Sequence, residues 1–125
     1  MSDSITLISV ALDCPDAGAL AAFYAGITGG TVTFHDDRWA TMKAPGVRID
    51  FQQAAGYQPP AWPDPASSMQ MHLDFYVDDP DAAEARVLAA GATKYDAQPG
   101  DHFRVYADPA GHPFCLCVED EPGQG

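Results

Sequence analysis

The second half of the sequence repeats the first at a constant spacing, and this repeat limits the folds open to the chain more than any single motif does. Pro15–Ala17 recurs as Pro80–Ala82, and the turn at Gly46 recurs at Gly111. Each half has the pattern of a strand, a helix that Pro-Asp begins, and further strands separated by glycine turns. The sequence therefore predicts one module built twice, with the copies packed as pseudo-symmetric partners around a shared cavity.

Length, composition and charge set the outer limits. A chain of 125 residues with 46% hydrophobic residues has enough apolar surface for one compact domain with a core. No apolar run approaches the roughly 20 residues of a membrane span, and residues 1–4 lack the basic and apolar regions of a leader peptide. The net charge of −12 opposes binding to nucleic acid or anionic lipid. We therefore expect a cytoplasmic protein with no nucleic-acid or membrane partner.

Residue patterns divide the chain into two modules and a crossover. We expect a single domain over 1–125 that comprises module one at 5–53, a crossover at 54–70, module two at 71–119 and a tail at 120–125. The crossover is rich in proline, which excludes a helix or a central strand. It is either a rigid spacer or, through Tyr57 and Trp62, a partial lid over the cavity.

Strands and helices are predicted at similar places in both modules. Module one has a strand over 5–12, a helix from Pro15-Asp16 to Gly29-Gly30, and strands over 31–35, 39–44 and 47–53. Module two has a strand over 71–78, a helix over 80–90, and strands over 103–106 and 114–118.

Three cysteines are expected to be reduced thiols, namely Cys14, Cys115 and Cys117.

Strand alternation assigns side chains of module two to opposite faces. His72, Asp74 and Tyr76 share the face that points away from the packed layer. Arginine is costly to place against a helix layer, so Arg104 and Tyr106 are expected to face the cavity, as the alternation of their strand allows.

Several segments of the chain resemble one known superfamily. Leu12–Asp16, His72–Asp74, Val77–Asp79 and Ala107–Phe114 look like the vicinal oxygen chelate superfamily, in particular its glyoxalase-like bacterial members. The resemblance implies an α+β fold in which two βαβββ modules form an incomplete eight-stranded barrel, the glyoxalase/bleomycin resistance/dioxygenase fold. It also implies a cup-shaped site for a small molecule and a homodimer. Catalytic members hold a divalent metal with side chains from four strands.

Resemblance to glyoxalase I implies where a metal would be held. The matching positions are Ser9, Asp50, His72 and Cys115, of which only His72 is retained outright. Ser9 is a poor metal ligand, and the strict spacing of the repeat would instead match His72 with Leu7. The candidate metal set is therefore His72, Asp50 and Cys115. The sequence leaves open whether this incomplete site binds one divalent ion (zinc, nickel or iron) or none.

Other side chains on the expected cavity faces suit a small organic ligand. Aromatic residues supply walls, and two arginines can fix a carboxylate through their bidentate fork. The candidate ligand-binding residues are Trp39, Arg48, Gln52, Trp62, Arg104, Tyr106 and Cys117.

Two classes of function remain open. The first is a glyoxalase-like binding protein that holds an aromatic or carboxylate-bearing metabolite in the cup. The alternative is a metal-dependent lyase, isomerase or dioxygenase, in which His72 and Asp50 hold the metal while Asp74 or Tyr76 moves a proton.

Overall fold

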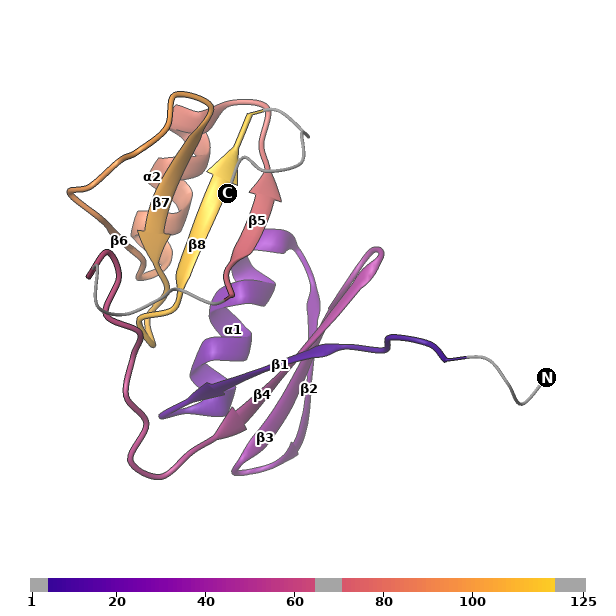
Figure 1. Cartoon of the computed structure of the whole chain (residues 1–125). Helices are drawn as coiled ribbons and strands as arrows, with labels where there is room; N and C mark the ends of the chain where they lie inside the picture. The colour runs from indigo at the N-terminus through magenta and orange to yellow at the C-terminus, as the bar shows by residue number, and fades with distance from the viewer. Residues whose placement is uncertain (1–4, 65–70, 119–125) are drawn as a thin grey trace. The chain divides into compact units, whose positions relative to one another are not determined.

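The computed structural model describes residues 5–64 and 71–118, so the tail and residues 65–70 of the predicted crossover lie outside the described residues. The chain forms two compact units, Met1–Tyr57 and Gln58–Gly125. Within the described residues, each unit has one four-stranded sheet and one helix, in the order βαβββ (Figure 1). The predicted α+β class and the duplicated order of elements are confirmed.

The first unit consists of β1 (Val10–Cys14), α1 (Ala17–Thr28), β2 (Thr31–Asp36), β3 (Trp39–Ala44) and β4 (Val47–Gln53), with strand order β1-β4-β3-β2. α1 covers one face of this sheet, where Tyr24 stacks on Phe51 at 5.8 Å. The first strand was predicted over 5–12, but its pairing with β4 begins only at Val10. Alternation in sequence predicts an extended backbone and cannot show where the hydrogen-bonded partner begins.

The second unit consists of β5 (Leu73–Tyr76), α2 (Pro80–Ala90), β6 (Thr93–Lys94), β7 (Phe103–Ala107) and β8 (Pro113–Cys117), with strand order β5-β8-β7-β6. Beneath α2, Phe114 meets Phe75 edge-on and stacks on Tyr106. β6 was not predicted, because a two-residue strand has no detectable period. No helix among residues 5–64 and 71–118 is long and apolar enough to cross a membrane.

The two helices begin at positions that the sequence repeat does not match. Asp16 caps α1 by accepting from the Ala19 amide, whereas Asp79 caps α2 by accepting from the amides of Asp81 and Ala82. Asp79 is therefore the structural counterpart of Asp16, although the repeat pairs Asp16 with Asp81. Pro80 is the first residue of its helix, while Pro15 precedes the cap. The structural equivalence of the two Pro-Asp-Ala segments was thus a wrong prediction.

The strand registers show the same shift and identify the counterpart of His72. Ala11 lies opposite Asp50 in the first sheet, and Asp74 lies opposite Cys115 in the second. Because the repeat pairs Asp50 with Cys115 and the two occupy equivalent strands, Asp74 corresponds to Ala11. His72, two positions earlier, therefore corresponds to Ser9 rather than Leu7.

Arg104 and Tyr106 lie against α2, so the prediction that they face the cavity was wrong. The Arg104 guanidinium donates to Asp81 at 2.9 Å and to Glu84 at 3.4 Å, and the Tyr106 hydroxyl donates to Glu84 at 2.7 Å. Lys94 forms an ion pair with Glu84 at 2.8 Å. The acidic side chains of α2 offset the cost of placing arginine beneath a helix. The compensating charges lie on another element of the chain, and alternation along a single strand carries no information about them.

Candidate metal and ligand site

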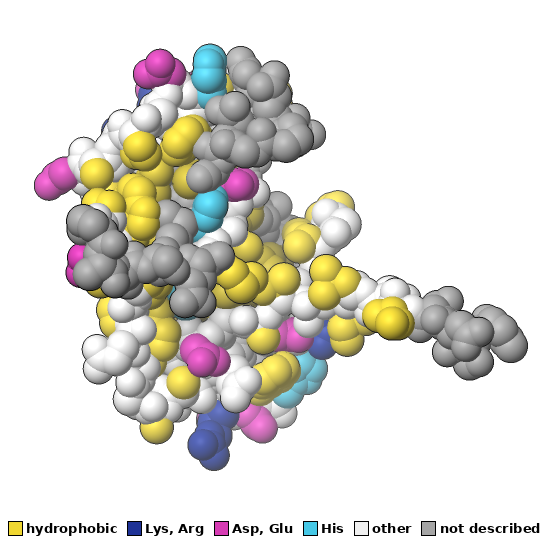
Figure 2. Space-filling model, in the orientation of Figure 1, with side chains coloured by type: hydrophobic (Ala, Val, Ile, Leu, Met, Phe, Trp, Pro, Cys, Tyr) yellow, Lys and Arg dark blue, Asp and Glu magenta, His cyan; other side chains and the backbone are white. Residues whose placement is uncertain are grey.

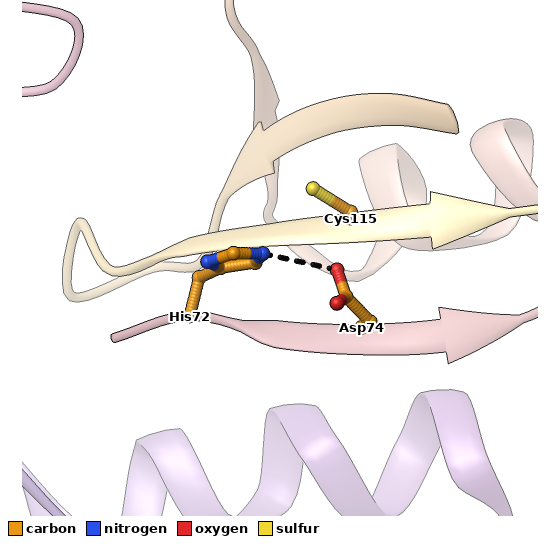
Figure 3. Close-up of side chains that lie close together, drawn as sticks. All are labelled: His72, Asp74 and Cys115. Atoms are coloured by element: carbon orange, nitrogen blue, oxygen red, sulfur yellow. Dashed lines mark ion pairs between the residues drawn. The ribbon is translucent and has the colours of Figure 1, made fainter. Parts of the chain in front are cut away.

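The face of the second sheet that is turned away from α2, here called the open face, brings three potential metal ligands together. His72 directly precedes β5, Asp74 lies on β5, and Cys115 lies on the neighbouring strand β8 (Figure 3). Their ligand atoms all lie within 4.8 Å of one another. Strand geometry explains the grouping, since residues two apart share a face and Asp74 lies directly opposite Cys115.

The His72 imidazole is the most constrained member of this group. Its Nε2 atom lies 3.2 Å from Asp74 Oδ1, but the two groups are not aligned for a hydrogen bond. Nε2 is buried and is the one buried side-chain nitrogen or oxygen in the described part of the chain that lacks a hydrogen-bond partner. Such an atom is costly in a folded protein unless something else satisfies it.

Both thiols on the open face are held in the neutral form. Burial, with a further contribution from the Asp74 carboxylate, raises the pKa of Cys115 to about 12. The same causes, in the same order, raise the pKa of Cys117 to about 11. Neither is therefore suited to act as a nucleophile near neutral pH without a positive partner such as a metal ion. Cys14, Cys115 and Cys117 are reduced thiols, as predicted, and all three are buried.

Three aromatic side chains border this polar group. Trp62, Tyr95 and Phe103 pack against the buried cluster of Val105, Cys115 and Cys117. Trp62 meets Tyr95 edge-on, with ring centroids 4.7 Å apart. Figure 2 shows hydrophobic side chains gathered over β7 and β8. Trp62 therefore packs on the open face of its own unit, so this part of the crossover does more than join the two modules.

The loop that carries Tyr95 is fixed by the side chain of Gln98. Its amide nitrogen donates to the carbonyls of Tyr95 and Val105, at 2.8 and 2.9 Å. Its amide oxygen accepts from the Val105 backbone N–H at 2.9 Å. The Gln98 side chain thereby takes the hydrogen bonds that a neighbouring strand would make and holds the aromatic wall in place.

The equivalent face of the first sheet carries a closed polar network. The Asp50 carboxylate accepts from Ser9 at 2.7 Å, from Thr41 at 2.6 Å and from Arg48 Nε at 3.1 Å. Burial raises the pKa of Asp50, but the hydrogen bonds from Thr41, Ser9 and Arg48 outweigh it and lower the pKa overall. Asp50 is 4% exposed, and both of its oxygens accept hydrogen bonds. The hydrogen-bond donors to the Asp50 carboxylate therefore all lie within the first unit.

His35 extends this network in a way that the sequence did not suggest. Its Nε2 atom lies 2.9 Å from the Thr41 hydroxyl. Because that hydroxyl donates its hydrogen to Asp50, the imidazole must be the donor at Nε2. The resulting chain runs from His35 through Thr41 to Asp50.

The predicted site residues therefore separate into three groups. The open face of the second sheet brings together His72, Asp74, Tyr76, Cys115 and Cys117, with Trp62 packed on it. Trp39, Arg48, Asp50 and Gln52 share the corresponding face of the first sheet. Arg104 and Tyr106 lie against α2. Tyr95 and Phe103 were missed as wall residues, and no signal in the sequence placed Tyr95 near Trp62.

The donor atoms on the open face fit a borderline divalent cation. Imidazole nitrogen, carboxylate oxygen and thiolate sulfur are the ligand types of zinc sites, and three protein ligands leave a coordination position open. The buried Nε2 of His72, which has no hydrogen-bond partner, is the structural observation that supports this fit. A bound ion of this kind would act as a Lewis acid toward a ligand oxygen.

Comparisons with known proteins agree with the duplicated βαβββ architecture. A family model described as "Glyoxalase-like domain" matches residues 9–117. A glyoxalase/bleomycin resistance protein/dioxygenase family enzyme from Burkholderia phytofirmans PsJN is similar, with TM-score 0.71 and 20% identity over 90% of this chain and 97% of that one. No curated protein matched the sequence.

Two further solved structures share the fold. The fosfomycin resistance protein FosX from Mesorhizobium loti has TM-score 0.68 and 16% identity, covering 95% of this chain and 94% of that one. The oxidase ChaP-H2 has TM-score 0.67 and 23% identity, covering 98% of this chain and 99% of that one. At these identities the likeness extends to the fold alone.

Proposed function

Since the chain belongs to the family of glyoxalase-like domains, we propose that it binds a small aromatic molecule with oxygen substituents on the open face of the second sheet. The observation that carries this proposal is the aromatic wall directly beside the polar group. Trp62, Tyr95 and Phe103 pack around Cys115 and Cys117, and Cys115 belongs to the group that includes His72 and Asp74.

The aromatic wall and the polar group beside it both suit such a ligand. Aromatic rings offer large apolar contact area, and Trp62, Tyr95 and Phe103 are only partly buried. The imidazole and carboxylate beside the wall supply a few oriented polar contacts, which is the composition typical of small-molecule sites. Trp39, Arg48 and Gln52 lie in the other unit, and their part in binding stays a prediction.

Ligand binding is expected to quench the fluorescence of Trp62. The chain has two tryptophans, so a Trp39→Phe variant retains Trp62 as its one tryptophan. Titration of this variant with catechol and salicylate is expected to give saturable quenching. Phe103→Ala in the same background should weaken binding about tenfold, because one aromatic contact is lost. The converse variant, Trp62→Phe, retains only Trp39, so its fluorescence detects a ligand that binds at the first sheet. Saturable quenching in that variant alone would contradict the proposal and place the ligand on the first sheet.

A metal-dependent lyase, isomerase or dioxygenase is the second candidate function. The observation that favours it is the His72, Asp74 and Cys115 donor set. Tyr76 follows on the same strand face and is 61% exposed, and its phenol is a group that can transfer a proton to a bound substrate. Turnover that requires zinc, nickel or iron and falls in Tyr76→Phe would favour this candidate over simple binding.

A further inference from the structure

We propose that the second unit alone holds a zinc-type cation, through His72 Nε2, the Asp74 carboxylate and Cys115 Sγ, and that Asp50 takes no part. The proposal deepens the proposed function, since the cation would lie beside the aromatic wall on the same face. It differs from the set expected from the resemblance by replacing Asp50 with Asp74.

The geometry of two adjacent strands carries the assignment. Asp74 and Cys115 are register partners in the parallel pair of β5 and β8. His72 lies two positions before Asp74, so its side chain projects from the same face. All three ligand atoms lie within 4.8 Å of one another (Figure 3).

The lack of a hydrogen-bond partner at His72 Nε2 is a second observation. His72 Nε2 is buried, 3.2 Å from Asp74 Oδ1, and makes no hydrogen bond within the described chain. A cation bound at this nitrogen would satisfy its lone pair and would also be attracted by the neighbouring carboxylate. On binding, the Cys115 thiol gives its proton to solvent and coordinates as the thiolate.

The hydrogen bonds of Asp50 explain why it is left out. Its two oxygens accept from Ser9, Thr41 and Arg48, and the Arg48 guanidinium already neutralises its charge. Coordination by Asp50 would require those bonds to be broken and would leave an arginine without its partner. The Asp74 side chain is instead 46% exposed and lies 3.2 Å from His72, so a cation can approach it.

The donor set also predicts which ions bind. A thiolate and an imidazole favour zinc and cobalt, whereas magnesium requires oxygen ligands in octahedral geometry. We therefore expect the site to take up zinc or cobalt and to leave magnesium in solution.

Metal titration of chelator-treated full-length protein tests the assignment without any organic ligand. Native mass spectrometry is expected to show one zinc or cobalt ion per chain, and cobalt is expected to give a near-ultraviolet sulfur-to-cobalt charge-transfer band. Removing any one proposed ligand should lower the affinity for zinc and cobalt by more than the roughly 10–100-fold that is typical when a residue supporting a metal ligand is lost. The variants that test this are His72→Ala, Asp74→Asn and Cys115→Ser. Cys115→Ser changes one atom, so it keeps the fold while removing the band.

Two matched variants separate this site from its alternatives. Asp50→Asn should bind cobalt as the natural chain does, and Cys117→Ser, which removes the other thiol from the same face of β8, should keep the band. The proposal is overturned if the natural chain binds no zinc or cobalt, if Asp50→Asn abolishes binding, or if the band depends on Cys117 instead of Cys115. Quenching of Trp62 by catechol in a protein that binds no metal would overturn the metal site and leave the proposed ligand site standing.

Discussion

Replacing Asp50 by alanine is expected to lower the free energy of unfolding by about 3 kcal/mol, the low end of the range for removing one partner of a buried ion pair. The low end applies because the Arg48 side chain is 33% exposed and can turn to water, whereas the Asp50 side chain is 6% exposed. The alanine also leaves the hydroxyls of Ser9 and Thr41 without their acceptor. Urea unfolding at neutral pH, followed by circular dichroism, measures the loss.

The loss from Asp50→Ala should depend on pH in a defined direction. Because hydrogen bonds hold the folded-state pKa of Asp50 below its ordinary value, the carboxylate stabilises the fold at neutral pH. That contribution disappears as the pH falls through the lowered pKa, so the natural chain and the variant should converge in acid. Asp50→Asn, which keeps the shape and one acceptor, should lose about 1.5 kcal/mol. A stability gap that stays constant from neutral pH into the acid range would contradict this account.

Replacing Tyr106 by alanine is expected to cost about 3–5 kcal/mol of stability, as is usual for removing a buried aromatic ring. Tyr106 is 0% exposed and stacks on Phe114 at 5.5 Å. Its hydroxyl donates to Glu84 on α2, and burial followed by that contact raises the pKa of Tyr106 well above its ordinary value. The residue therefore anchors the helix to its sheet, and thermal or urea unfolding of the variant measures that role.

Tyr106→Phe is the matched control, because it removes the hydroxyl and keeps the ring. It should cost only about 1–1.5 kcal/mol, since Glu84 retains its ion pair with Lys94. If Tyr106→Ala were nearly as stable as the natural chain and yet abolished quenching by catechol, Tyr106 would be a ligand contact and its assignment to the α2 face would be refuted.

The duplicated fold could be predicted because its signals are local and periodic. Pro-Asp helix starts, glycine ends and alternating strands located both helices and seven of the eight strands that the described residues form. The match to the glyoxalase-like domain confirms the resemblance. Local sequence patterns gave a wrong orientation where a side chain's position depends on a partner far away in the sequence. The prediction for Arg104 followed from its charge alone, and it was wrong because Asp81 and Glu84 on α2 compensate that charge.

The candidate site was only partly accessible from sequence for a related reason. His72 and Cys115 could be singled out from the resemblance, and Asp74 could be placed on the same strand face as His72. The register of β5 and β8, which sets Asp74 directly opposite Cys115, could not be read from the repeat, because β1 and β5 are related by a slightly shorter spacing than β4 and β8. The hydrogen bonds that occupy Asp50 likewise depend on three strands meeting in space.

The ligands of a bound cation are expected to come from His72, Asp74 and Cys115. X-ray absorption at the zinc edge of protein loaded with one equivalent of zinc measures the ligand atoms directly. The expected result is one sulfur at about 2.3 Å, with nitrogen and oxygen making up the remaining shell. A shell of nitrogen and oxygen alone, or one with two sulfurs, would contradict it.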